Sequence, residues 1–196
     1  MRLHQLIGDR PDLPAIAAHL DGLDNESRIA ETMSLGRSEQ RALFRAAKGF
    51  REIHVTDFVP SRTGPMREIV HHGRNTLPAF RRFAKVFCQP DEPEGELWGY
   101  NRNGPFIMTT VGPGYFVAYD HGDGEVLIDY LRQPPAKPRA WPEIASITSR
   151  FSRFVYHGTQ DLMRGVSKHV NIGRATRGGK EMAAWFVLCR EDHGES

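Results

Sequence analysis

The sequence predicts an α+β fold in which helices cover a curved antiparallel sheet, a β-meander that can close into a barrel. Three observations predict it. The first fifty residues carry apolar side chains at helical spacing between glycines. Short alternating segments between 97 and 130 are separated by turn-forming residues, which is typical of an antiparallel meander. The last apolar segments flank a Gly-Gly pair, which predicts a closing hairpin.

Length and composition predict a single domain. The chain has 196 residues, of which 39% are hydrophobic and 26% are charged, in the range of ordinary globular proteins. We divide it into an N-terminal helical segment (1–50) packed on the main domain, the antiparallel α+β domain itself (51–190) and a frayed tail (191–196).

Three short helices are expected in the N-terminal segment. Asp12 can cap the first helix, which has Pro14 in its first turn and ends at Gly22. The second is expected over 26–35 and the third over 39–48. Helices of this length are marginal alone, so we expect them to cover one side of the sheet.

The central part of the chain is expected to contain one strand, one long loop and the meander. Alternating apolar residues predict a strand over 52–58, and three prolines and two glycines predict a surface loop over 60–79. The dipeptide Asn103-Gly104 suits a two-residue hairpin turn. The strands expected in the meander are 97–102, 106–111, 115–120 and 125–131.

The C-terminal part is expected to mix helices with a final hairpin. A proline-rich surface connection over 132–142 precedes a helix that begins at Pro142 and ends near Gly158. Apolar spacing predicts a further helix over 160–170. The closing hairpin joins 170–177 to 180–190, and the side chains expected on one of its faces are Trp185, Val187 and Cys189.

Charge is segmented along the chain although the net charge is only +2. Residues 62–90 and 131–180 are strongly basic, and residues 91–130 between them are acidic and aromatic. The chain is arginine-rich, since only five of its 26 basic residues are lysines, and arginine pairs well with carboxylates and phosphates. The acidic meander is therefore expected to form either a pocket floor or an intramolecular charge match.

The candidate catalytic residues are His157 and Asp161. If 157–168 is continuously helical, these two residues share a face with Arg164 and Lys168, which places an acid/base pair beside an anion clamp. The alternative interpretation is the solvated face of an amphipathic helix, interrupted at Gly158.

The candidate ligand-binding residues are aromatic and basic. A curved sheet with helices on one side often leaves an apolar pocket, which tyrosines and arginines can use to orient a ligand. The alternative is that the aromatic residues form ordinary core. The predicted set is Trp98, Tyr100, Tyr115, Tyr119, Arg153, Arg164, Lys168 and Arg174.

No metal or cofactor is predicted. Cys88 and Cys189 lack metal-ligand spacing, the pair His71-His72 lacks further ligands, and neither glycine-rich segment matches a nucleotide-binding motif. The apolar runs are too short for a membrane span, and the N-terminus does not have the pattern of a signal peptide, so we expect a cytoplasmic protein.

Three functional hypotheses follow. The first is a pocket between the sheet and the helices that binds a small, largely apolar ligand with an anionic group. The second is an enzyme that uses a His/Asp acid-base pair in the same pocket. The third is nucleic-acid binding through the segments 62–90 and 131–180, against which the acidic middle argues. Formation of a homo-oligomer is compatible with all three.

Overall fold

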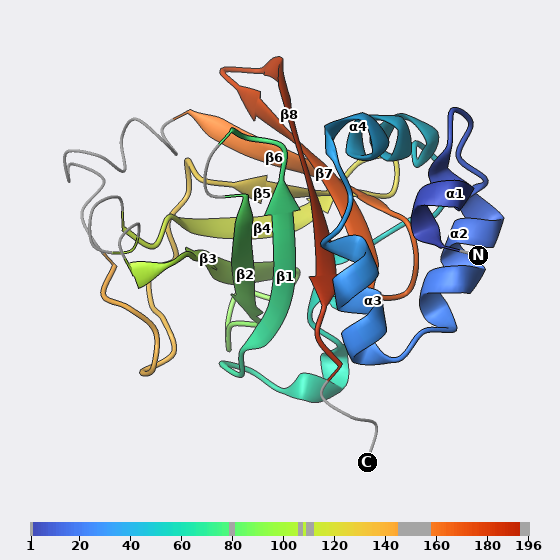
Figure 1. Cartoon of the computed structure of the whole chain (residues 1–196). Coiled ribbons are helices and arrows are strands. Elements are labelled where there is room, and N and C mark those ends of the chain that lie inside the picture. Colours follow the sequence, from blue (N-terminus) through green and yellow to red (C-terminus); the bar gives the residue numbers. More distant parts are fainter. Residues whose placement is uncertain (1, 79–80, 106–107, 109–111, 145–157, 193–196) are drawn as a thin grey trace.

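A closed antiparallel barrel forms the body of the protein. The computed structural model describes residues 2–78, 81–105, 108, 112–144 and 158–192 (Figure 1). In this part of the chain each strand pairs with its neighbours in chain order, and β8 (Lys180–Arg190) pairs back with β1 (Ile69–Asn75). The other strands are β2 (Arg82–Cys88), β3 (Glu96–Arg102), β4 (Tyr115–His121), β5 (Glu125–Asp129), β6 (Thr159–Gly165) and β7 (Val170–Arg177). The predicted α+β class with a barrel-like sheet is confirmed.

The N-terminal helices pack on one side of this barrel, as expected. They are α1 (Leu3–Ile7), α2 (Leu13–Asp21), α3 (Asn25–Thr32) and α4 (Arg37–Ala46). The carboxylate of Asp12 accepts a hydrogen bond from the amide of Ala15, at 3.1 Å, and so caps α2. Figure 1 shows these helices, in blue, beside β7 and β8. Helix α4 contacts both strands, and α3 contacts β8.

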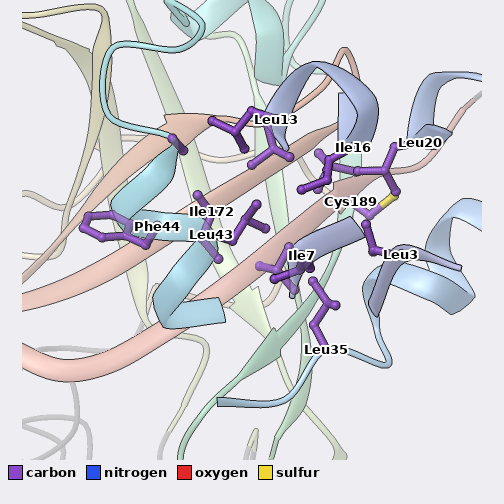
Figure 2. Close-up of a cluster of buried hydrophobic side chains, with 14 of the residues drawn as sticks. Leu3, Ile7, Leu13, Ile16, Leu20, Leu35, Leu43, Phe44, Ile172 and Cys189 are labelled. Carbon is purple, nitrogen blue, oxygen red and sulfur yellow. The ribbon is translucent and has the colours of Figure 1, made fainter. Parts of the chain in front are cut away.

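Apolar side chains fill the space between the helices and the barrel (Figure 2). Leu43 of α4 and Ile172 of β7 are fully buried in this cluster. Val187 and Cys189 reach it from β8 together with Trp185, so the face predicted for the last strand is correct. Burial of this face accounts for the stability of helices that are too short to persist alone.

A short helix closes one end of the barrel where a strand was expected. Residues 55–58 form α5 (Val55–Phe58), followed by a 3₁₀ turn, η1 (Ser61–Thr63). The carboxylate of Asp57 accepts a hydrogen bond from the amide of His54, at 2.8 Å, which favours a helical turn over a strand. Phe58 enters the barrel core and stacks on His71, with 5.5 Å between the ring centroids.

Two further predictions of secondary structure are wrong. Strand β1 lies inside the segment 60–79 that was expected to be a loop. The segment predicted as a helix over 160–170 contains β6 and the start of β7. In β6 the residues Thr159, Asp161, Met163 and Gly165 are buried alternately, so its true period is two and not 3.6.

The meander is confirmed for three of its four strands. β3 pairs with β2 and β4, so the strand expected at 106–111 is not its neighbour. Residues 106–107 and 109–111 lie outside the described residues, as does most of the helix expected from Pro142 to Gly158. The hairpin of β7 and β8 closes at Gly178-Gly179 as predicted.

The last described residues attach to both parts of the molecule. The amide of Glu191 donates a hydrogen bond to the carbonyl of Val70, and Asp192 pairs with Arg28 at 2.9 Å. Residues 193–196 of the expected tail lie outside the described residues. Within the described ranges, no helix has both the length and the apolar character needed to cross a membrane.

Candidate functional site

Three phenylalanine rings lie over three glycines inside the barrel. Each ring belongs to a strand paired with the strand of its glycine, and the two residues are directly opposite each other in the register. A Cβ atom at Gly99 would lie 2.4 Å from the ring of Phe116, so only glycine at this position leaves room for the ring. The three pairs are Gly73 with Phe83, Gly99 with Phe116, and Gly173 with Phe186.

The amine of Lys85 lies among these three rings. Lys85 stands between Phe83 and Phe87 on the inward face of β2 and is buried. Its Nζ atom is 5.8, 4.9 and 5.2 Å from the ring centroids of Phe83, Phe116 and Phe186, and 4.9 Å from that of Tyr130. The faces of aromatic rings attract a cation, so this cage favours positive charge at Nζ.

Three polar side chains complete the surroundings of Lys85. Its Nζ donates hydrogen bonds to Asn101 Oδ1, at 3.0 Å, and to Tyr130 Oη, and forms an ion pair with Asp161 Oδ2 at 3.2 Å. Tyr130 Oη donates to Asp161 Oδ2 at 3.3 Å and accepts from Asn101 Nδ2 at 2.9 Å. We call Lys85, Asn101, Tyr130 and Asp161 the interior polar cluster.

The ion pair of this cluster crosses the barrel. Lys85 comes from β2 and Asp161 from β6, and four steps separate these strands in either direction around the closed sheet. Asn101 and Tyr130 lie at the carboxyl ends of β3 and β5. The cluster therefore lies toward one end of the barrel, which we call the Lys85 end, opposite the end that Phe58 closes.

Burial changes the proton affinity of both charged groups. Burial lowers the pKa of the Lys85 amine, and the nearby Asp161 carboxylate opposes this effect. Burial likewise raises the pKa of the Asp161 carboxyl, and the charge and hydrogen bond of Lys85 oppose it. The two shifts bring the ionic pair closer in free energy to a neutral pair of amine and carboxylic acid.

Asp161 is the predicted catalytic residue that belongs to this cluster. Because β6 is a strand, Arg164 points to the outside, where its Nε pairs with Glu125 at 2.6 Å and its Nη1 donates to the carbonyl of Phe44. Lys168 is exposed in the turn between β6 and β7, and its amide donates to the carboxylate of Asp21. His157, the partner expected for Asp161, lies outside the described residues.

The aromatic residues predicted to bind a ligand lie on the outer face of the barrel. Trp98, Tyr100 and Tyr115 are buried there against Trp141, which comes from the connection after β5. The rings of Tyr100 and Trp141 have centroids 4.9 Å apart. Tyr119 is partly buried, with Arg132 over its ring.

The remaining predicted residues do not reach this outer cluster. Arg174 pairs with Glu181 and lies over the ring of Trp185, outside the barrel. Arg153 lies outside the described residues. The structure therefore does not bring the predicted ligand-binding set together.

Sequence reasoning missed Lys85, Asn101 and Tyr130 as site residues. The sequence did contain a signal for Lys85. Residues 83, 85 and 87 of a strand lie on the same face, so Lys85 shares an apolar face with Phe83 and Phe87. Long-range pairing of β2 with β1 and β3 was needed to recognise that strand.

The charged segments of the sequence pair with one another. Glu96 pairs with Arg132 at 2.8 Å, and Glu125 pairs with Arg164. In both pairs the carboxylate comes from the acidic segment 91–130 and the arginine from the basic segment after it. An intramolecular charge match is therefore present on the outside of the barrel.

The polar groups inside the barrel are an amine, a carboxyl, a phenol and an amide at the Lys85 end, and the imidazole of His71 toward the end that Phe58 closes. No cluster of three His, Cys, Asp or Glu side chains that could hold a metal occurs within the described ranges. Comparison with protein-family models, with curated proteins and with solved structures finds no match to this chain.

Proposed function

We propose that the barrel binds a small, largely apolar ligand at its Lys85 end, through an anionic or carbonyl oxygen that replaces one of the three oxygens now in contact with Lys85 Nζ. The observation that carries the proposal is the Lys85–Asp161 pair, which crosses a largely apolar and aromatic interior. Eight-stranded barrels are of the size that holds either side chains alone or one small ligand.

The energetics of burial support a functional role for this pair. Removing two charges from water costs several kcal/mol for each ion, and well-packed apolar residues often give equal or greater stability. Phe83, Phe116 and Phe186 supply an apolar wall for the body of a ligand. Asn101 and Tyr130 orient the lysine that would contact its oxygen.

A double variant separates binding from stability. In K85M/D161L both charges are replaced by apolar groups of similar size, so folding stability is expected to stay equal or to rise by about 1–4 kcal/mol. Binding of octanoate and benzoate, measured by isothermal titration calorimetry, is expected to weaken about tenfold or more, because a hydrogen bond to a charged group contributes about 1.5–3 kcal/mol.

The matched control is R102M/E68L, which removes an exposed ion pair from the outside of the barrel. This variant should bind both carboxylates as the unmodified protein does. If K85M/D161L also binds them unchanged, the ligand site lies elsewhere. If the unmodified protein binds neither carboxylate and carries no small molecule in native mass spectrometry, the proposal fails.

A further inference from the structure

We propose that Lys85 forms a Schiff base with the carbonyl carbon of an apolar aldehyde or ketone, with Asp161 as the proton carrier. The inference rests on the proposed function, because the carbonyl compound is the ligand placed at the Lys85 end. It goes further in assigning a covalent reaction to that site. Geometry, charge and the lysine content of the chain each contribute to it.

The geometry supplies a proton acceptor for the amine. An ammonium group must lose a proton before its nitrogen can attack a carbonyl carbon. Asp161 Oδ2 lies 3.2 Å from Nζ, within reach for that transfer, and Tyr130 Oη is in contact with both groups. Desolvation by burial lowers the pKa of the Lys85 amine and raises that of the Asp161 carboxyl, and so favours the neutral amine and the neutral acid that result.

The reaction balances without any other reactant. Asp161 takes one proton from Nζ, the nitrogen lone pair bonds to the carbonyl carbon, and the C=O π pair moves to oxygen, which takes the proton from Asp161. Asp161 then removes a second proton from nitrogen and gives it to the same oxygen. The C–O bond breaks and water leaves. The product is an iminium ion that keeps the third ammonium proton, and Asp161 is again a carboxylate.

The rings and the carboxylate around Nζ favour the iminium product over the neutral amine that attacks the carbonyl carbon. The neutral amine has no charge for the rings to attract, whereas the iminium ion is a cation at the same position. The ring centroids of Phe116 and Phe186 lie 4.9 and 5.2 Å from Nζ. These rings and the Asp161 carboxylate would stabilise the iminium ion. The site therefore stabilises the positive charge that the nitrogen regains as water leaves.

The chain offers its own controls for a trapping experiment. It has five lysines, of which Lys48, Lys168 and Lys180 are exposed and Lys137 is half-buried. An exposed amine is protonated at neutral pH and reacts slowly. We would incubate the protein at pH 7 with benzaldehyde or hexanal, reduce with cyanoborohydride, and locate the added mass by peptide mapping.

Lys85 is expected to be modified before the other four lysines, and K85M to lose this modification. D161N keeps the shape of the carboxyl but cannot accept the proton, so its rate of trapping should fall at least ~100-fold. The labelling pattern of the unmodified protein decides the question even if a variant fails to fold.

The two proposals fail in different ways. Modification of the exposed lysines with Lys85 untouched, while octanoate still binds, overturns the Schiff base and leaves the binding function standing. Equal trapping rates in D161N and the unmodified protein overturn the role of Asp161. Absence of both octanoate binding and Lys85 modification overturns both proposals.

Discussion

A few residues inside the barrel are charged or polar, although barrel interiors usually contain apolar side chains. Lys85, Asp161 and His71 are all buried in the barrel, and each is held by specific partners. Of these, sequence reasoning identified Asp161 as a site residue, but Arg164 and Lys168, two of the neighbours predicted for it, lie outside the barrel. A carboxylate of β6 meets an amine of β2 only when the sheet closes, and local patterns carry no information about that closure.

His71 is expected to make folding stability depend on pH. Burial lowers its pKa from 6.5 to about 3, and only the hydrogen bond to the Phe58 carbonyl opposes the shift. The unfolded chain therefore binds a proton between pH 6.5 and 3 that the folded protein does not. The contribution of His71 is complete above pH 6.5 and is lost as the pH falls, by about 1.4 kcal/mol per unit.

The measurement is urea unfolding followed by tryptophan fluorescence at pH 7, 6, 5 and 4. In H71Q, which keeps a donor for the Phe58 carbonyl but does not titrate, stability should fall less steeply with acid. The matched control is H121Q, at an exposed histidine, which should keep the slope of the unmodified protein. Equal slopes in H71Q and the unmodified protein would contradict the assignment.

At the scale of elements, helices with caps and strands joined by tight turns were predicted, whereas strands without such local signals were missed. Caps and glycines are local signals, so α2 and α4 were found with nearly correct ends. Strand β1 was hidden by prolines and glycines on both sides, and β6 by charged residues whose spacing also fits a helix. Both strands are defined by their partners across the sheet, which lie far away in sequence.

The pairing of β3 with β4 is expected to depend on Gly99. In G99A the new methyl group would lie 2.4 Å from the Phe116 ring and 2.6 Å from the carbonyl oxygen of Val86. Forcing an atom into packed space costs typically ~1–3 kcal/mol, so the free energy of unfolding should fall by that amount. Displacement of Phe116 should also reduce the modification of Lys85 by aldehydes.

The control for this change is G104A. A Cβ atom at Gly104 would meet nothing within 4 Å, so the stability change should stay within about 0.5 kcal/mol. Urea unfolding of both variants provides the comparison. If G99A is as stable as G104A, the ring does not occupy the space above Gly99 in solution.

For the whole molecule, the helical segment and the barrel share one apolar cluster. Leu43 of α4 is fully buried against residues of β7 and β8. Replacing Leu43 with alanine should destabilise the protein by about 2–5 kcal/mol, and helical and tryptophan signals should still be lost together. The control is L77A, at a leucine that is 47% exposed, which should change stability by less than ~0.5 kcal/mol.

Circular dichroism and fluorescence, recorded on the same urea series, check this prediction. Two separate transitions in L43A would mean that residues 1–50 unfold independently of the barrel. A single unfolding transition of L43A at a lower urea concentration would indicate that residues 1–50 and the barrel unfold as one cooperative unit.

The closure of β8 on β1 also sets an order in which the chain can fold. The helices rest on β7 and β8, the last two strands of the barrel in chain order, and the amide of Asp192 donates a hydrogen bond to Asn25 across 167 residues of sequence. Until those strands emerge from the ribosome, the apolar faces of the helices have no partner and β1 has an open edge. Contacts of such long range slow folding. The helices and β1 are therefore exposed to aggregation, and to chaperones, until β7 and β8 have been made.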